Sequence, residues 1–276
     1  MKAISINNIE NFLYLFQDKN IDFNDIRWVE PVFITMLNVY KGRTKGALFS
    51  NNDYIRSMIQ KTYSSNKTYS PTEQVFYRDD VENVSEHLTS IMLQNFSSLI
   101  PSDVRDLRDY LQYLFSELLN NVADHAHSDV GGYAMAQYYP TYKKIQFAVA
   151  DAGVGFLENI RLNYKDIFTD GEAILKALEK GVTSTRARMY QSFKNAGHGL
   201  YAMFEILQMT GGTFVIISQG TLVRYDGERL IVKELQYDWD GSVVVFEFFE
   251  NNIDFDMDYI KKNFLWNDRE EEEDFF

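Results

Sequence analysis

The chain has 276 residues, of which 45% are hydrophobic and 24% are charged, a composition typical of a globular protein with one large domain or two modest ones. It contains no cysteine, which excludes disulfides, thiol nucleophiles and cysteine-ligated metals. No apolar run approaches the roughly 20 residues that cross a bilayer, and the first residues lack the long apolar core of a secretory signal. We therefore expect a cytoplasmic protein.

The net charge of −13 bears on the kind of partner that the protein binds. Binding to nucleic acid depends on neutralising phosphates, so a strongly acidic surface argues against that class of partner. Part of the acidic charge lies in the last residues, NDREEEEDFF, and we expect 251–276 to form a C-terminal helix and an acidic tail. We expect neither a membrane nor a nucleic acid as partner.

The first part of the chain alternates short strand-like and helix-like segments, which predicts a small α/β domain over 1–72. Strand-forming residues in IDFNDIRWVEP end at Pro31, and VFITMLNVYKG then predicts a helix that closes at Gly42. A short strand in KGALFS and a capped helix from about Asn52 follow. Polar, turn-rich residues over 64–72 predict a linker to the rest of the chain.

Two helical stretches follow, around 80–98 and 103–126, separated at Pro101, with 73–102 as the connecting region. Beyond them, GGYAMAQYY and KKIQFAVAD predict two antiparallel strands. The amphipathic helix GLYAMFEILQMT is stopped by two glycines, and three strand segments follow it: TFVIIS, RLIVKELQY and SVVVFEFF. The last two flank DWDG, which predicts a turn between them.

The stretch 103–126 carries two neighbouring stripes. An apolar stripe recurs at steps of three and four, made by Leu107, Leu111, Leu114, Leu118 and Val122. Glu117, Asn121 and Asp124 follow the same steps beside it. One face is therefore expected to pack on a core while the adjacent face presents carboxylates and an amide together. A solvated polar face is the alternative interpretation, and motifs further along the chain bear on the choice.

Two loops that contain glycine follow this helix. In DAGVGF, Asp151 leaves an apolar strand, and Gly153 and Gly155 allow the backbone to approach a ligand closely. In NAGHGLYAM, a glycine-flanked loop runs straight into a helix, whose free N–H groups form an anion site suited to phosphates. Gly241 and Ser242 then open the last strand segment. Each of these patterns is common by itself, and their order along the chain is what makes them specific.

In chain order, E-x-x-x-N on a helix, D-x-G-x-G after a strand, G-x-G-L before a helix and G-S at a late strand resemble the GHKL ATPase family over about 105–250. That family includes gyrase-type topoisomerases, heat-shock chaperone ATPases, mismatch-repair ATPases and histidine kinases. The resemblance implies an α+β fold over 103–250, a two-layer α/β sandwich in which helices cover a mixed, mostly antiparallel sheet. It also implies a lid over the phosphates at 157–196.

The resemblance further implies a site for ATP and Mg²⁺. Asn121 is then the Mg²⁺ ligand, and Glu117 orients or deprotonates the attacking water. Asp151 accepts a hydrogen bond from the adenine amino group, with Ser242 supporting that contact. The other expected nucleotide-binding residues are Asp124, Gly153, Gly155, Thr183, Ser184, Gly197, His198, Gly199 and Leu200. Asn120 and His125 are expected to pack beside the site rather than to bind the ligand.

The N-terminal unit is similar to STAS-like domains, which accompany stand-alone GHKL ATPases in bacteria. In anti-sigma systems a GHKL serine kinase acts on a separate STAS partner. Glu30 and Pro31 stand at the helix start of this unit, where a phosphoacceptor Ser or Thr would be needed. We therefore expect an interaction role for the unit and no phosphoacceptor switch in it.

These expectations combine into one functional hypothesis, an ATP-binding protein with slow, Mg²⁺-dependent hydrolysis. It would act as a conformational switch for an unidentified protein partner in bacterial regulation or defence. Two alternatives stay open at this point: an anti-sigma-type protein serine/threonine kinase, and a non-catalytic nucleotide-binding scaffold. Members of the family often dimerise, so a homodimer is a further expectation.

Overall fold

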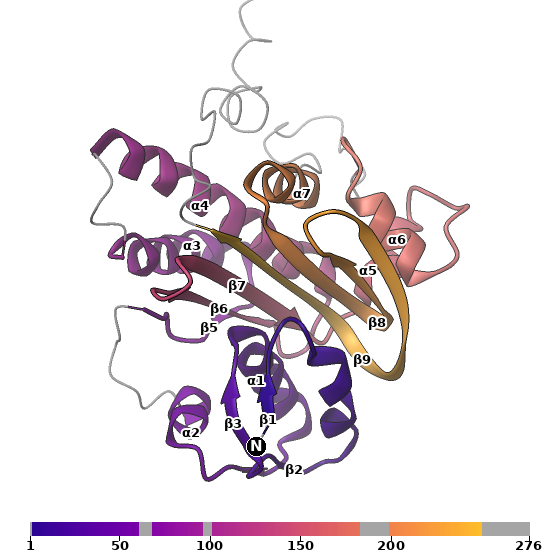
Figure 1. Cartoon of the computed structure of the whole chain (residues 1–276). Helices are drawn as coiled ribbons and strands as arrows, with labels where there is room; N and C mark the ends of the chain where they lie inside the picture. The colour runs from indigo at the N-terminus through magenta and orange to yellow at the C-terminus, as the bar shows by residue number, and fades with distance from the viewer. Residues whose placement is uncertain (1, 61–67, 96–100, 183–198, 250–276) are drawn as a thin grey trace, which may run out of the picture.

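A five-stranded sheet forms the centre of the computed structural model, which describes residues 2–60, 68–95, 101–182 and 199–249 (Figure 1). Its strands in spatial order are β5 (Glu73–Val75), β6 (Gly132–Tyr139), β7 (Lys144–Asp151), β9 (Leu230–Phe249) and β8 (Thr213–Tyr225). All four pairings within this sheet are antiparallel, where a mixed sheet was expected. The predicted α+β class is confirmed.

Helices cover one face of this sheet (Figure 1). They are α3 (Arg78–Leu93), α4 (Pro101–Asn121), α5 (Gly155–Ile160), α6 (Asp170–Ala177) and α7 (Gly199–Thr210). The predicted apolar stripe of α4 and of the turn after it is buried in this core, and Phe115 of α4 stacks on Phe147 of β7 with ring centroids 4.4 Å apart. Among the described helices, none combines the length and the apolar character needed to cross a membrane.

The N-terminal residues cover the opposite face of the sheet (Figure 1). They comprise β1 (Lys2–Ile4) parallel to β3 (Ile26–Val29), β2 (Ile21–Asp22) parallel to β4 (Leu48–Phe49), the 3₁₀ helix η1 (Ile9–Gln17), α1 (Pro31–Thr44) and α2 (Asp53–Gln60). The first ten residues of α1 are all buried, as in a helix that is apolar all round, and α1 packs on β6, β7 and β9.

The apolar core of the N-terminal unit is thus continuous with the back of the sheet. Met135, Ala148 and Val215 belong to the same buried cluster as α1. Both faces of β7 are covered, so every residue of KIQFAVAD after Lys144 is buried, and Phe147–Ala150 form an unbroken apolar run rather than an alternating one. The last residues of the segment expected to be a linker, 64–72, are not a free connection. The Ser70 N–H donates to the Ala136 carbonyl oxygen at 2.8 Å, so this part of the chain continues the edge of the sheet.

The prediction of a turn at DWDG is wrong. β8 and β9 form one long hairpin that turns at 226–229, and DWDG lies inside β9. Ser218 pairs with Ser242 and Gln219 with Trp239, so two residues of β9 form a bulge there. Gly241 in this bulge has a φ of 131°, and a Cβ atom on it would lie 2.2 Å from the Asp151 carbonyl oxygen. Glycine is common both in turns and in bulges, so the residues DWDG alone do not distinguish the two.

A buried polar cluster joins the N-terminal unit to the sheet. The Glu30 carboxylate, at the start of α1, accepts hydrogen bonds from the Ile6 N–H at 2.6 Å and from Gln146 Nε2 at 2.9 Å. Gln146 Nε2 also donates to Glu247 Oε1, and Lys144 Nζ lies 2.7 Å from that oxygen. Burial raises the pKa of Glu30, and the nearby Glu247 carboxylate raises it further.

We predict that Glu30→Gln changes how stability depends on pH. The raised pKa means that the folded protein holds the Glu30 proton to higher pH than the unfolded chain does. Glu30 therefore lowers the free energy of unfolding as pH rises from about 4.5, the unfolded value, through its folded pKa. Gln stays neutral, so the variant should gain stability relative to wild type between pH 4 and pH 8. Urea titrations of both proteins across that range measure the difference, and a flat or falling difference would contradict the assignment.

Candidate functional site

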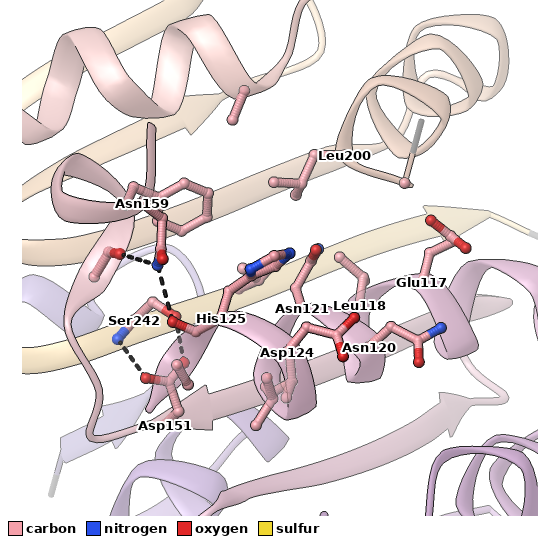
Figure 2. A pocket seen from close by; sticks show the side chains of 18 of the residues that line it. Glu117, Leu118, Asn120, Asn121, Asp124, His125, Asp151, Asn159, Leu200 and Ser242 are labelled. Carbon is pink, nitrogen blue, oxygen red and sulfur yellow. Dashed lines mark hydrogen bonds between the residues drawn. The ribbon is translucent and has the colours of Figure 1, made fainter. Parts of the chain in front are cut away.

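One cavity gathers most of the residues that the motifs single out (Figure 2). It is lined by the end of α4 and the turn that follows it, by the end of β7, by β9 at and beyond its bulge, by α5, by the starts of α3 and α7, and by the end of α6. The expected site residues on its wall are Glu117, Asn121, Asp124, Asp151, Gly155, Gly199, Leu200 and Ser242. Segments more than a hundred residues apart in sequence thus meet at one place.

Other expected site residues are not on this wall. Thr183, Ser184, Gly197 and His198 lie outside the described residues. Gly153 is in the loop after β7, but what it approaches is the end of the α4 region: a Cβ atom on Gly153 would lie 1.9 Å from the Ala126 carbonyl oxygen. The close approach that its glycine permits is therefore between two backbone segments, whereas contact with a base was expected.

The α4 helix ends in a widened π-helical turn, η2 (Val122–Ala126), closed by His127 with a φ of 52°. Such turns often occur at functional sites. Two donors satisfy carbonyl groups that a helix end leaves free: Val154 N–H donates to Ala126 O at 2.9 Å, and Asn159 Nδ2 donates to His125 O at 2.9 Å. The loop after β7 therefore fixes the turn that carries Asp124 and His125.

The Asp151 carboxylate lies at one end of the row of labelled side chains (Figure 2). Asp151 is only 2% exposed, and its Oδ1 accepts from the Gly153 N–H at 2.8 Å and from the Ser242 N–H at 3.3 Å. The Ser242 hydroxyl donates to the other carboxylate oxygen. Burial raises the pKa of Asp151, and the hydrogen bonds from Ser242 and Gly153 oppose that effect. The contact between Ser242 and Asp151 is the one that the resemblance implies.

Glu117 lies at the opposite end of the row, with Asn121 and His125 between it and Asp151 (Figure 2). The start of α7 packs directly on Glu117, since a Cβ atom on Gly199 would lie 2.8 Å from the Glu117 Cβ and 2.9 Å from its Oε2. Burial raises the pKa of Glu117 to about 7, the Arg78 charge lowers it, and the Asp124 charge raises it. Near neutral pH this carboxyl group can therefore both hold and accept a proton.

Several residues of the cavity wall belong to no motif in the sequence. Arg78 is the one among them that carries a charge. Arg78 Nε and Nη2 donate to the two carboxylate oxygens of Asp124, each at 2.5 Å. The pair joins α3 to the turn after α4, and no motif in the sequence links these positions. Asn120 and His125 also line the cavity. Burial lowers the pKa of His125 and favours its neutral form, which agrees with a packing role.

The apolar part of the wall was also missed, because its residues belong to ordinary core patterns. They are Leu118, Val122, Val149, Phe156, Ile160, Ala177, Val182 and Val244. Ala173 and Ile174 of α6 are fully buried in the main core. The first part of the segment expected to be a lid is therefore packed against the sheet.

The side chains fit a Mg²⁺ ion held mainly by a bound phosphate and water. In the described part of the chain, no group of three or more His, Cys, Asp or Glu side chains is placed to hold a metal ion. Mg²⁺ needs no such cage, because it is commonly held by one or two protein oxygens together with phosphate oxygens and water. The amide oxygen of Asn121 on the cavity wall is a suitable ligand of this kind.

Comparison with known proteins adds no assignment: no family model matches the chain, and no curated protein matches it. The resemblance to GHKL ATPases therefore stays a prediction that rests on the motif residues.

We predict that Gly153→Ala destabilises the fold. A Cβ atom 1.9 Å from Ala126 O forces the loop after β7 away from the η2 turn, and such overpacking typically costs about 1–3 kcal/mol. Gly42→Ala is a matched control. Gly42 lies within α1, and a Cβ atom on it would meet Val130 at 3.4 Å, an ordinary van der Waals distance. That change should leave the free energy of unfolding equal or slightly higher. Chemical denaturation of the two variants tests this, and equal effects would contradict it.

Proposed function

We propose that the protein binds Mg²⁺–ATP in this cavity, hydrolyses it slowly, and acts as a nucleotide-driven switch for a protein partner. The fold would then be that of a GHKL ATPase, with α4, α5 and α7 over one face of the sheet. One observation carries the proposal: Glu117, Asn121, Asp151 with Ser242, and Gly199 line the same cavity. The roles proposed for them below are those that the motif order implies.

The Asp151 end of the cavity suits the adenine ring. A buried carboxylate held by Ser242 and Gly153 is a fixed hydrogen-bond acceptor, and the adenine amino group is a donor. The apolar side chains of Val149, Ile160 and Val244 line the same cavity. An apolar pocket with few, well-placed polar groups is the common form of a small-molecule site.

The Glu117 end suits the phosphates. The start of α7 lies there, and the first N–H groups of a helix together with its dipole favour an anion. Asn121 lies between the two ends of the cavity and would ligate Mg²⁺ through its amide oxygen (Figure 2). The metal, when bound, neutralises negative charge on the phosphates.

Glu117 is proposed as the general base for hydrolysis. Its carboxylate would accept a proton from a water molecule whose oxygen attacks the terminal phosphorus, while the bond to the bridging oxygen breaks and ADP leaves. A base works best when its pKa lies near the working pH, and the pKa of Glu117 is about 7. Burial against α7 is thus what prepares Glu117 for this role.

We predict that Glu117→Gln separates binding from turnover. The amide keeps the size of the side chain but cannot accept the proton, so the hydrolysis rate should fall by about 10²–10⁴-fold while the affinity for Mg²⁺–ATP changes only a few-fold. In the wild type, kcat/KM should rise with pH and level off above about 7, because only the deprotonated carboxylate acts as base. Phosphate release and calorimetric binding measure the two quantities.

Glu158→Gln, an exposed change on α5 away from the cavity wall, is the control and should alter neither quantity. Equal loss of binding and turnover in Glu117→Gln would remove the base assignment. Binding without any turnover in the wild type would instead favour a scaffold. If Mg²⁺–ATP neither binds nor raises the melting temperature of the wild type, the nucleotide proposal fails.

A further inference from the structure

The charges on the cavity wall are unbalanced for a site that takes a polyanion. Three carboxylates line it, Glu117, Asp124 and Asp151. Arg78 is the one Lys or Arg on the wall within the described residues. A nucleoside triphosphate would add further negative charge, and among the Lys and Arg side chains on the described wall only Arg78 could offset it.

Arg78 is placed at the phosphate end of the cavity. It is the first residue of α3, and its side chain reaches across to Asp124 on the turn after α4. The charges of both Arg78 and Asp124 act on Glu117. Hydrogen bonds from Ser242 and Gly153 hold Asp151 at the other end.

The Arg78–Asp124 pair is built in a way that allows exchange of partners. It is bidentate, with both contacts at 2.5 Å, but the Arg78 side chain is 59% exposed and that of Asp124 is 20% exposed. An ion pair with so much solvent access contributes little to stability. The planar fork of Arg matches a phosphate as well as it matches a carboxylate.

Building on the proposed function, we propose that Arg78 is a phosphate-binding residue that leaves Asp124 and binds the terminal phosphate of Mg²⁺–ATP. Asp124 then serves as the partner that holds Arg78 in the nucleotide-free protein. ADP lacks the terminal phosphate, so Arg78 would stay with Asp124 when ADP is bound. The exchange gives the site a preference for the triphosphate and links nucleotide state to the first turn of α3.

The competing explanation is that the pair only ties α3 to the η2 turn. The two explanations differ in what they predict for ATP against ADP. A structural tie supports the whole cavity, so its loss should weaken both nucleotides alike. A phosphate contact concerns only the nucleotide that carries the terminal phosphate.

The experiment compares binding of a non-hydrolysable ATP analogue and of ADP, both with Mg²⁺, by titration calorimetry. Arg78→Ala should weaken the analogue by about 10- to 100-fold, as expected for loss of a charge-assisted hydrogen-bonding pair, and ADP by less than about threefold. Arg78→Lys should fall between wild type and Ala, because Lys provides a charge without the fork. Asp124→Asn removes the carboxylate that competes for Arg78, so it should raise the affinity for the analogue relative to that for ADP.

Arg56→Ala is the matched control, because Arg56 is also a half-exposed arginine paired with an aspartate, Asp53, and it is not on this wall. It should change neither affinity, and the melting temperature of each variant shows that it is folded. Equal weakening of both nucleotides by Arg78→Ala, or loss of analogue binding in Asp124→Asn, would overturn the proposal and leave the proposed function standing. If the wild type binds neither nucleotide, both fail.

Discussion

The hydrogen bonds of the Asp151 carboxylate are the interaction on which the site depends. They join the end of β7 to the loop after it, through Gly153, and to the bulge of β9, through Ser242. That loop in turn donates from Val154 to the Ala126 carbonyl oxygen and so fixes the turn after α4. Asp151, which is 2% exposed, thus connects β7, β9 and the turn after α4, three of the segments that line the cavity. Because a buried carboxylate without donors would be unstable, these contacts are needed both for folding and for the shape of the site.

Both faces of the sheet are covered, one by the helices and the other by the N-terminal unit. The cavity lies between the helices and the sheet, where β7 ends and β9 bulges. The N-terminal unit therefore supports the site from behind, through α1 and through the cluster of Glu30, Gln146 and Glu247, without lining the cavity.

The sequence predicts the local parts of this structure well and the long-range parts poorly. The α4 stripe, the strands β6 and β7 and the helix α7 follow from periodicity, and all of them are found. The sequence predicts a turn where β9 has its bulge, because glycine at 241 suits both a turn and a bulge. The bulge is specified by the Asp151 backbone, which packs against Gly241 and is distant in sequence. Arg78 was missed because its partner Asp124 lies on another helix. Eight of the expected site residues line one cavity, whereas Gly153 lies off its wall, and their roles toward a ligand stay a prediction.

The carboxylates of Asp151 and Glu117 show how one fold can give the same chemical group two behaviours. Burial raises the pKa of both Asp151 and Glu117. At Asp151, hydrogen-bond donors on Ser242 and Gly153 oppose that effect and fix the carboxylate in place as an acceptor. At Glu117 the opposing influence is the charge of Arg78, whose side chain is 59% exposed. Any movement of Arg78 toward a phosphate would therefore alter the charge that Glu117 experiences, so binding of the nucleotide would also change the proton affinity of Glu117.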